Sequence, residues 1–132
     1  MEALEDMDKI STDKAPSAIG PYSQAVRAGQ FVFCSGQIGM DPATGKLIGA
    51  DIESQTRQVM QNLRSVLAAA SLDFNHVAKT TIFLVNLEDF SSVNEIYGAE
   101  FGEQKPARAT VQVAGLPLGA LIEIECVAYI AK

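Results

Sequence analysis

The 132-residue chain contains only two cysteines and one histidine, and this scarcity limits the sites that it can build. Cys34 and Cys126 lie far apart in the sequence, and neither belongs to a CxxC pair. Because zinc sites draw their ligands mainly from cysteine and histidine, the usual ligand sets are hard to assemble here. We therefore expect no metal site and no disulfide framework. We expect instead two reduced, buried thiols in a cytoplasmic protein.

Positively charged residues are also few. Ten Lys and Arg stand against sixteen Asp and Glu, which gives a formal net charge of -6. No window of the sequence holds a basic run, whereas proteins that bind nucleic acid neutralise phosphates with clustered basic residues. We therefore do not expect nucleic acid or an anionic membrane surface to be the primary partner.

Long apolar runs are absent. No stretch approaches the roughly 18 consecutive apolar residues that a membrane span requires. The first eight residues carry four acidic side chains and no apolar segment, so we expect neither a signal peptide nor a transit peptide. The composition is typical of a globular protein. We expect a flexible acidic arm over residues 1–8 and a single domain over residues 9–132.

Local patterns in the first half of the chain predict a hairpin, a loop and a helix. Short apolar runs at 24–28 and 31–35 lie on either side of Gly29, which favours a β-hairpin. Residues 40–49 are rich in turn formers and predict a loop. Asp51 can cap a helix whose apolar residues recur at a spacing of 3.6 as far as Ala70.

The second half predicts three strands and one more helix. The strands cover 76–85, 108–114 and 121–130, and a helix capped by Asn86 extends to Phe101. The last four residues of the first of these strands are all apolar, which indicates a central strand covered on both faces. Short apolar runs broken by turn residues begin at Lys9, and one further strand among them gives the element order β-β-β-α-β-α-β-β. This order predicts an α+β domain with two helices packed on one face of a mixed sheet.

The two final strands carry charged residues at alternating positions. Arg108, Thr110 and Gln112 share one face of their strand, and Glu123 and Glu125 lie on the polar face of the next strand. If the two strands form a hairpin, the arginine and the two glutamates decorate the uncovered face of the sheet. The rest of that face is partly apolar, and such a face usually contacts another subunit. We therefore expect a homo-oligomer.

Arg108 and Glu123 each have two interpretations. Arg108 either pairs with a strand glutamate or provides a planar fork that binds the carboxylate of a substrate. Glu123 is either a salt-bridge partner or a partly buried base that activates a water molecule. His76 is expected on the surface. The chain lacks GxGxxG, P-loop, HExxH and GxSxG motifs, so dinucleotide, nucleotide-triphosphate, zincin and serine-hydrolase chemistry have no support.

Six separated segments carry a family resemblance. They are residues 18–25 (AIGPYSQA), 35–38 (SGQI), 90–94 (FSSVN), 106–111 (PARATV), 114–117 (AGLP) and 122–124 (IEI). On pattern alone the loop segments around Tyr22 and Ser35 can be either turns or parts of a site. Together, and with their spacing, the six segments resemble the Rid family, the RidA/YjgF-type group of 2-iminobutanoate/2-iminopropanoate deaminases. The resemblance extends from about Ile10 to the C-terminus.

The resemblance implies a fold, an assembly and a reaction. The implied fold is chorismate-mutase-like (YjgF-type), and the implied assembly is a homotrimer whose sheets line a central barrel, with active sites between subunits. The implied reaction is the hydrolysis of reactive imines and enamines, left by pyridoxal-phosphate enzymes, to 2-oxo acids and ammonia. No cofactor and no metal are implied.

The resemblance also assigns roles to individual positions. It implies that Arg108 binds the substrate carboxylate and that Glu123 positions or activates the attacking water. The implied pocket residues are Tyr22, Ser35 and Asn94, with backbone hydrogen bonds near Gly36 and Thr110. Many family members have cysteine at the position of Thr110. We expect imine hydrolysis to survive this difference, because the implied role of that position belongs to the backbone.

Three other functions stay open. The Arg108 pocket could belong to a regulatory module that binds a 2-oxo acid or amino acid without turnover, although the presence of Glu123 favours catalysis. Endoribonuclease or translation-inhibitor activity is attributed to some relatives, but the net charge and the lack of a histidine pair oppose it. Nothing in the sequence bears on a holdase-like chaperone activity.

Overall fold

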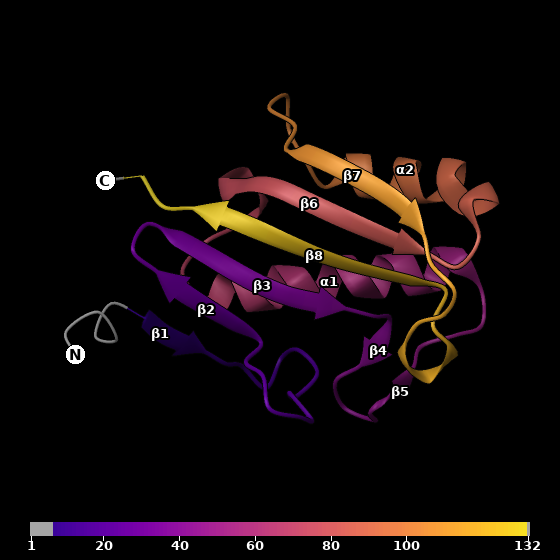
Figure 1. The fold of residues 1–132 in the computed structure, drawn as a ribbon, viewed down its shortest axis with the longest axis horizontal. Coiled ribbons are helices and arrows are strands. Elements are labelled where there is room, and N and C mark those ends of the chain that lie inside the picture. The colour runs from indigo at the N-terminus through magenta and orange to yellow at the C-terminus, as the bar shows by residue number, and fades with distance from the viewer. Residues whose placement is uncertain (1–6, 132) are drawn as a thin grey trace.

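The computed structural model describes residues 7–131, which form a six-stranded mixed sheet with two helices on one face (Figure 1). Its strands are β1 (Met7–Ile10), β2 (Ala25–Ala28), β3 (Phe31–Gln37), β6 (Val77–Leu84), β7 (Ala107–Gln112) and β8 (Ile122–Tyr129). The helices are α1 (Ile52–Ala69) and α2 (Phe90–Ala99). The strand order is β1-β2-β3-β8-β6-β7, and only β6 and β7 pair in parallel. The predicted α+β class and element order are confirmed.

The N-terminal arm predicted over residues 1–8 lies mostly outside the described residues. Its last two members, Met7 and Asp8, belong to β1 and pair with β2. Sequence analysis placed them in the arm because the first eight residues are acidic and contain no apolar run. Their strand geometry comes from β2, which offers them an antiparallel partner.

The predicted loop over residues 40–49 contains a short ribbon. Its strands are β4 (Met40–Asp41) and β5 (Lys46–Leu47), which pair with each other and not with the main sheet. Gly45 closes the turn between them with a φ of 72°, a conformation that favours glycine. The turn chemistry was therefore predicted correctly, and the two-residue pairings were missed.

Helix α1 is the amphipathic helix that the sequence predicts. The Asp51 carboxylate caps it by accepting a hydrogen bond from the backbone N–H of Ser54 at 2.8 Å. Its apolar side chains are buried against the sheet, and each fully buried one contributes about 1.5–3 kcal/mol. Among residues 7–131, no helix is long and apolar enough to cross a membrane.

Two buried polar side chains of α1 hold loops next to the sheet. Asn62 Nδ2 donates to the carbonyl oxygens of Ile38 and Met40 at 3.1 and 2.9 Å. Gln55 Nε2 donates to the Gly49 carbonyl at 2.8 Å. The Gln55 Oε1 accepts from the backbone N–H of Leu121, also at 2.8 Å. These bonds position the chain on both sides of a small cavity described below.

Helix α2 is shorter than predicted. The Asn86 side chain accepts from the Glu88 N–H at 2.9 Å, as expected of a cap, but it caps a 3-10 turn over Leu87–Asp89. The α-helix begins only at Phe90 and ends at Ala99 instead of extending to Phe101. Phe101 is nevertheless buried, and its ring packs 4.8 Å from that of Tyr97.

The hairpin expected between the two final strands is wrong. Strand β6 lies between β7 and β8 (Figure 1). The unit β6-α2-β7 is a helical crossover, and such a connection makes the two strands parallel. Strand β8 instead pairs antiparallel with β3 and β6.

This topology also moves Arg108 to the other face of the sheet. Residues directly opposite each other on paired strands share a face. Phe83 of β6 lies opposite Glu123 on the face away from the helices, whereas Arg108 lies opposite the buried Thr80 on the face that the helices cover. The expectation that Arg108 and the glutamates decorate one uncovered face is therefore wrong.

The face of the sheet away from the helices is half apolar. Phe31, Phe33 and Tyr129 form an aromatic patch there, with ring centroids 6.2 Å apart for Phe31 and Phe33 and 5.5 Å apart for Phe31 and Tyr129. Each of the three side chains is more than 40% exposed. On β6, Thr81 and Phe83 are only partly buried, so this strand is central but is not covered on both faces within one subunit.

Candidate active site

Arg108 lies at the edge of the sheet and contacts α2. Its Nη1 donates to the side-chain oxygen of Asn94 at 2.6 Å. The guanidinium carbon lies 5.2 Å from the ring centroids of both Phe90 and Tyr97. Cation–π contacts with these two rings and the bond to Asn94 fix the guanidinium. Among residues 7–131 no ion pair includes Arg108, so the remaining N–H groups of its fork can bind an anion.

A cavity of about 420 Å³ opens beside this guanidinium. Leu87, Phe90, Arg108 and Thr110 line it. The Thr110 hydroxyl is buried and has no hydrogen-bond partner within the described part of the chain. Thr110 is also one of the predicted site residues. We call Asn94, Arg108 and Thr110, with the surrounding Phe90 and Leu87, the arginine half-site.

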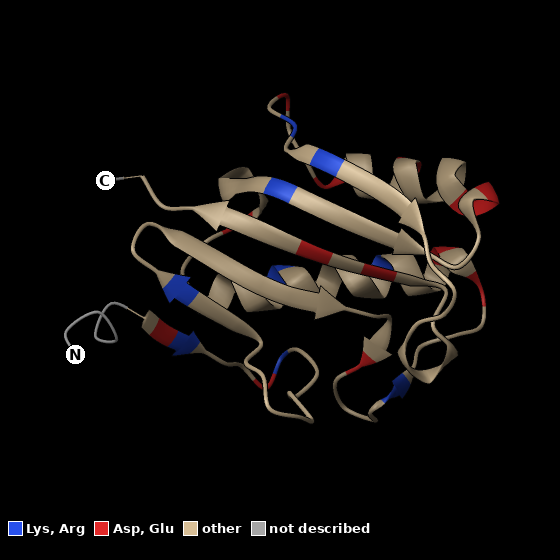
Figure 2. Cartoon of the chain, viewed as in Figure 1, with Lys and Arg blue, Asp and Glu red and all other residues tan. Residues whose placement is uncertain are grey.

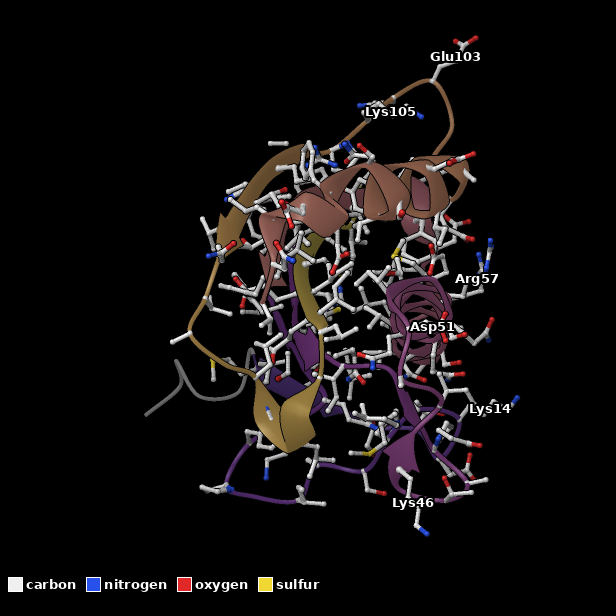
Figure 3. All side chains as sticks on the ribbon, turned by 90° about the vertical axis from the view of Figure 1, so that its right-hand side faces the viewer. Lys14, Lys46, Asp51, Arg57, Glu103 and Lys105 are labelled. Carbon is white, nitrogen blue, oxygen red and sulfur yellow. The ribbon has the colours of Figure 1, made fainter. Side chains whose placement is uncertain are left out.

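Lys105 is a second cation close to Arg108, but its ammonium group already donates hydrogen bonds to backbone carbonyls. Lys105 projects from the loop after α2 (Figure 3). Its Nζ donates to the carbonyl oxygens of Phe101 and Gly98 at 3.2 and 3.4 Å. Since a cation near the last carbonyls stabilises a helix C-terminus, we assign Lys105 to capping α2.

Glu123 lies on the opposite face of the sheet, in a cavity of about 160 Å³. Predicted site residues Tyr22 and Gly36 line the same cavity. The other lining residues are mainly apolar: Pro16, Ile19, Ile38, Met40, Pro117 and Leu118, with Ser17 and Gln37. We call this set the glutamate half-site.

The electrostatics of the glutamate half-site favour proton transfer. Burial raises the pKa of the Glu123 carboxyl, and the negative charge of Glu125 raises it further. A carboxyl whose pKa is shifted toward neutral accepts a proton from water more readily than an ordinary glutamate does.

Gly36 adjoins the Glu123 carboxyl so closely that a larger residue would displace it. A Cβ at position 36 would lie 2.8 Å from Glu123 Cδ and would collide with Oε2. Strand β3 has an irregular register between Cys34 and Gln37, where its backbone approaches β8 in this way. Ser35 does not line the cavity, because its hydroxyl donates to the Ser23 carbonyl at 2.6 Å.

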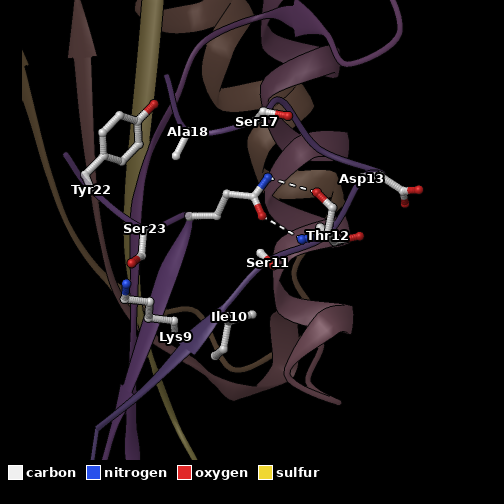
Figure 4. Close-up of a pocket in the computed structure, with 10 residues that line it drawn as sticks. Lys9, Ile10, Ser11, Thr12, Asp13, Ser17, Ala18, Tyr22 and Ser23 are labelled. Carbon is white, nitrogen blue, oxygen red and sulfur yellow. Dashed lines mark hydrogen bonds between the residues drawn. The ribbon is translucent and has the colours of Figure 1, made fainter. Parts of the chain in front are cut away.

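A wider hollow of about 750 Å³ shares Ser17 and Tyr22 with the glutamate half-site (Figure 4). Within it, Gln24 Oε1 accepts from the Thr12 N–H at 2.7 Å, and Gln24 Nε2 donates to the carbonyls of Thr12 and Pro16 at 3.0 and 2.7 Å. These bonds anchor residues 12–16 to Gln24, which directly precedes β2. The hydrogen bonds of Gln24 therefore hold in place the loop that carries Pro16 and Ile19 into the glutamate half-site.

Charged side chains are sparse on the sheet. Figure 2 shows acidic positions on β8 and basic positions on β6 and β7. Of the charged residues that Figure 3 labels, Arg57 lies on α1, Asp51 caps that helix and Lys46 lies in β5, whereas the others lie in loops. His76 is near the surface, with its Nδ1 3.2 Å from Asp73 Oδ1. Among residues 7–131, no group of three or more His, Cys, Asp or Glu could hold a metal ion.

The structure brings six of the seven predicted site residues together in two sets, and Ser35 belongs to neither. Asn94, Arg108 and Thr110 form one set, and Tyr22, Gly36 and Glu123 form the other. The sets lie on opposite faces of the sheet. Sequence analysis missed the residues that surround them: Phe90, Tyr97, Ile19 and Leu118. The spacing of positions 90, 94 and 97 was the available signal, because it places these residues on one side of a helix.

Comparisons with known proteins show which family model, proteins and solved structures this chain is similar to. A family model described as endoribonuclease L-PSP matches residues 12–130. The chain is 51% identical over 119 residues to a human protein named 2-iminobutanoate/2-iminopropanoate deaminase, which covers 90% of this chain and 87% of that one. It is similar to RidA from an Antarctic Psychrobacter species, with 46% identity, a TM-score of 0.90 and coverage of 93% and 99%. It is also similar to E. coli TdcF with bound serine, with 42% identity, a TM-score of 0.89 and coverage of 94% and 99%.

Proposed function

Because the chain belongs to the family described as endoribonuclease L-PSP, which includes RidA-type deaminases, we propose that it hydrolyses small 2-imino acids to 2-oxo acids and ammonia. The proposed substrates are 2-iminobutanoate and 2-iminopropanoate, with the enamine 2-aminoacrylate, as released by pyridoxal-phosphate enzymes. One observation carries this proposal: a positioned guanidinium that has no ion-pair partner among residues 7–131, and a half-buried glutamate of raised pKa, occur at the family positions.

Arg108 is proposed to bind the substrate carboxylate. A guanidinium donates two parallel hydrogen bonds to a carboxylate, which fixes the position and the plane of the anion. The rings of Phe90 and Tyr97 and the amide of Asn94 hold the fork before the substrate arrives. Binding therefore costs little side-chain entropy.

Glu123 is proposed to act as the base toward water. Its carboxylate takes one proton from a water molecule while the oxygen attacks the carbon of the protonated C=N bond. The product is a tetrahedral carbinolamine. Glu123 then transfers this proton to the nitrogen, which becomes the leaving group. As the C–N bond breaks, the ionised Glu123 takes the proton of the carbinolamine hydroxyl, so ammonia is released and the 2-oxo acid is left. The proton on Glu123 passes to the released ammonia or to solvent, which restores the carboxylate. The reaction needs one water molecule and no redox partner.

We also propose that each active site joins two subunits. The two half-sites lie on opposite faces of the sheet, so one subunit cannot offer both to a substrate of three or four carbons. In a closed homotrimer, the arginine half-site of one subunit can face the glutamate half-site of the next, which produces three equal sites. The exposed aromatic patch supports such an assembly, because an apolar surface of this kind usually contacts protein.

RNA cleavage, which the family description names, has less support from the residues of this chain. The net charge is -6, and the single histidine is bonded to Asp73 at the surface. Nor does either half-site contain a cluster of basic side chains. A cytoplasmic location is part of the proposal and is supported by the two buried free cysteines, which suit a reducing compartment.

A coupled assay tests the proposed function. Threonine or serine dehydratase generates the imine, semicarbazide competes for it, and formation of free 2-oxo acid is followed with and without this protein. We expect the wild-type chain to accelerate 2-oxo acid release and Arg108→Ala to give no acceleration. No acceleration by the assembled wild-type protein would contradict the proposal. Binding of a 2-oxo acid without turnover would then favour the regulatory module.

A further inference from the structure

Two buried hydroxyl groups near Arg108 form a hydrogen bond that takes no part in the proposed proton transfers. Thr80 Oγ1 of β6 lies 2.7 Å from the hydroxyl oxygen of Tyr97 on α2. Thr80 is 2% exposed and Tyr97 is 6% exposed. Desolvation of polar groups costs free energy, and valine with phenylalanine would fill the same space without a polar atom. Packing alone therefore does not explain this pair.

The hydroxyl bond joins the two elements that contact Arg108. Thr80 lies directly opposite Arg108 on the paired strands β6 and β7. The Tyr97 ring lies 5.2 Å from the guanidinium carbon, at the other end of the arginine side chain. The three residues therefore form a closed ring of contacts, which consists of the strand pairing, the cation–π contact and the hydroxyl bond. Such a ring of contacts fixes the guanidinium relative to the backbone of β7.

The hydrogen bond to Asn94 does not by itself orient the guanidinium. Arg108 Nη1 donates to Asn94 at 2.6 Å, and one bond leaves the group free to turn about the line between the two atoms. Aromatic faces restrict that rotation, because a planar guanidinium stacks on them. Phe90 and Tyr97 both lie 5.2 Å from the guanidinium carbon. Phe90 is only partly buried, so the buried Tyr97 is the firmer support.

The Tyr97 ring is itself held in two ways. Its bond to Thr80 fixes the far end of the long axis of the ring, and the Phe101 ring, 4.8 Å away, restricts rotation about that axis. Burial raises the pKa of the Tyr97 hydroxyl by more than the Thr80 bond and the charge of Arg108 lower it. The tyrosine therefore stays neutral, and it orients the guanidinium without cancelling its positive charge.

We propose that Thr80 and Tyr97 are positioning residues for the reaction, and that the hydrogen bond between their hydroxyls sets the plane of the Arg108 guanidinium for the substrate carboxylate. This inference rests on the proposed function, because it requires a carboxylate bound to Arg108. Every contact in the argument lies within one subunit, so a neighbouring subunit is not needed to complete it. The pair acts through Arg108 and does not touch the substrate.

Removal of either hydroxyl tests the inference. Thr80→Val and Tyr97→Phe keep the shapes of the two side chains, so both variants should fold. Competition with semicarbazide gives kcat/KM for the imine, and calorimetry gives the Kd of 2-oxobutanoate, a carboxylate of the product class. We expect each variant to lower kcat/KM about fivefold and to raise the Kd by a similar factor. Thr80→Ser keeps the hydroxyl and should restore most of the loss.

Two combined variants distinguish positioning from general damage to the core. In Thr80→Val/Tyr97→Phe the loss should be no larger than in either single variant, because both changes remove the same bond. In an Arg108→Lys background, Thr80→Val should have no further effect, since an ammonium group has no plane to orient. The same fivefold loss in both backgrounds would show a purely structural role and would overturn the inference.

A matched control uses another buried threonine hydroxyl that is bonded at the same distance. Thr56 Oγ1 donates to the Ile52 carbonyl at 2.7 Å and lines neither half-site, so Thr56→Val should keep the wild-type kcat/KM and Kd. Wild-type values in both Thr80→Val and Tyr97→Phe would overturn the inference alone. If the wild type turns over no imine, the proposed function fails, and the Kd series then decides the inference. A wild type that also binds no 2-oxobutanoate would overturn both.

Discussion

At the scale of single residues, Arg108 is surrounded by groups that orient it and by none that neutralises it within residues 7–131. We predict that Arg108→Ala lowers kcat/KM by about 100-fold or more, because two charge-assisted hydrogen bonds are lost. Arg108→Lys should recover only part of this, since an ammonium lacks the planar fork. Steady-state kinetics measure the loss, and unchanged thermal unfolding serves as the control. A fully active Arg108→Lys variant would show that a point charge is sufficient.

As the pH decreases, protonation of Glu123 should lower the activity and raise the stability of the folded protein. Burial and the charge of Glu125 raise its pKa above the ordinary value of 4.5 in the folded state. The base is needed in its ionised form, so activity should fall as the pH decreases through this raised pKa. The folded state binds the proton more tightly than the unfolded state, so the ionised carboxylate lowers stability at neutral pH.

Glu123→Gln removes that ionised group and tests this balance. We predict a lower kcat together with a higher Tm at pH 7–8, since the variant needs no desolvated charge. The gain in Tm should shrink as the pH falls between the raised pKa and 4.5, and it should vanish below 4.5, where the wild-type carboxyl is protonated in both states. Thermal unfolding at a series of pH values measures it. A Tm below that of the wild type throughout would contradict the assigned environment of Glu123.

At the scale of elements, the side chain of Gln24 attaches the N-terminal loop to β2. Its amide makes hydrogen bonds to three backbone groups of Thr12 and Pro16 and is 4% exposed. We predict that Gln24→Met lowers the free energy of unfolding by about 2–4 kcal/mol, because those groups lose their partner. Chemical denaturation measures the change. Gln104→Met at an exposed loop position is the control, and an equal effect of both variants would contradict this role.

The elements also show where sequence reasoning succeeds and where it fails. Helix α1 was predicted with its cap, because periodicity and Asp51 are local signals. The pairing of β7 was predicted wrongly, because strands adjacent in sequence were assumed to be adjacent in space. The helix between β6 and β7 indicates a parallel crossover that places these two strands side by side. This signal is stronger than the short connection between β7 and β8, which had suggested a hairpin.

At the scale of the whole molecule, the aromatic patch should hold the subunits together. Phe33 lies on the half-apolar face and contacts Phe31, yet it is 48% exposed in the single subunit. We predict that Phe33→Asp gives folded monomers without deaminase activity, because a buried unpaired charge opposes association. Sedimentation and circular dichroism measure assembly and fold. Ile48→Asp, outside the patch, should stay assembled, and an assembled Phe33→Asp would contradict the assignment of the patch.

The division of the site into two half-sites could not be read from the sequence. Family resemblance supplied the positions of Arg108 and Glu123, and strand alternation gave their faces relative to their own strands. Their relation to each other depends on which strand lies between β7 and β8, which is a property of the whole sheet. Ile19 and Leu118 of the glutamate half-site were missed for a similar reason, since their two loops meet only in the folded chain.

The central claim is that a deaminase site forms between an arginine half-site and a glutamate half-site of different subunits. Mixing Arg108→Ala and Glu123→Gln subunits, by co-expression or by joint refolding, tests it most directly. Each variant alone should be nearly inactive. In a random one-to-one mixture, roughly a quarter of the subunit boundaries combine an intact Arg108 with an intact Glu123, so about a quarter of wild-type activity should return. If mixed trimers form and no activity returns, both residues act within one subunit, and the account is contradicted.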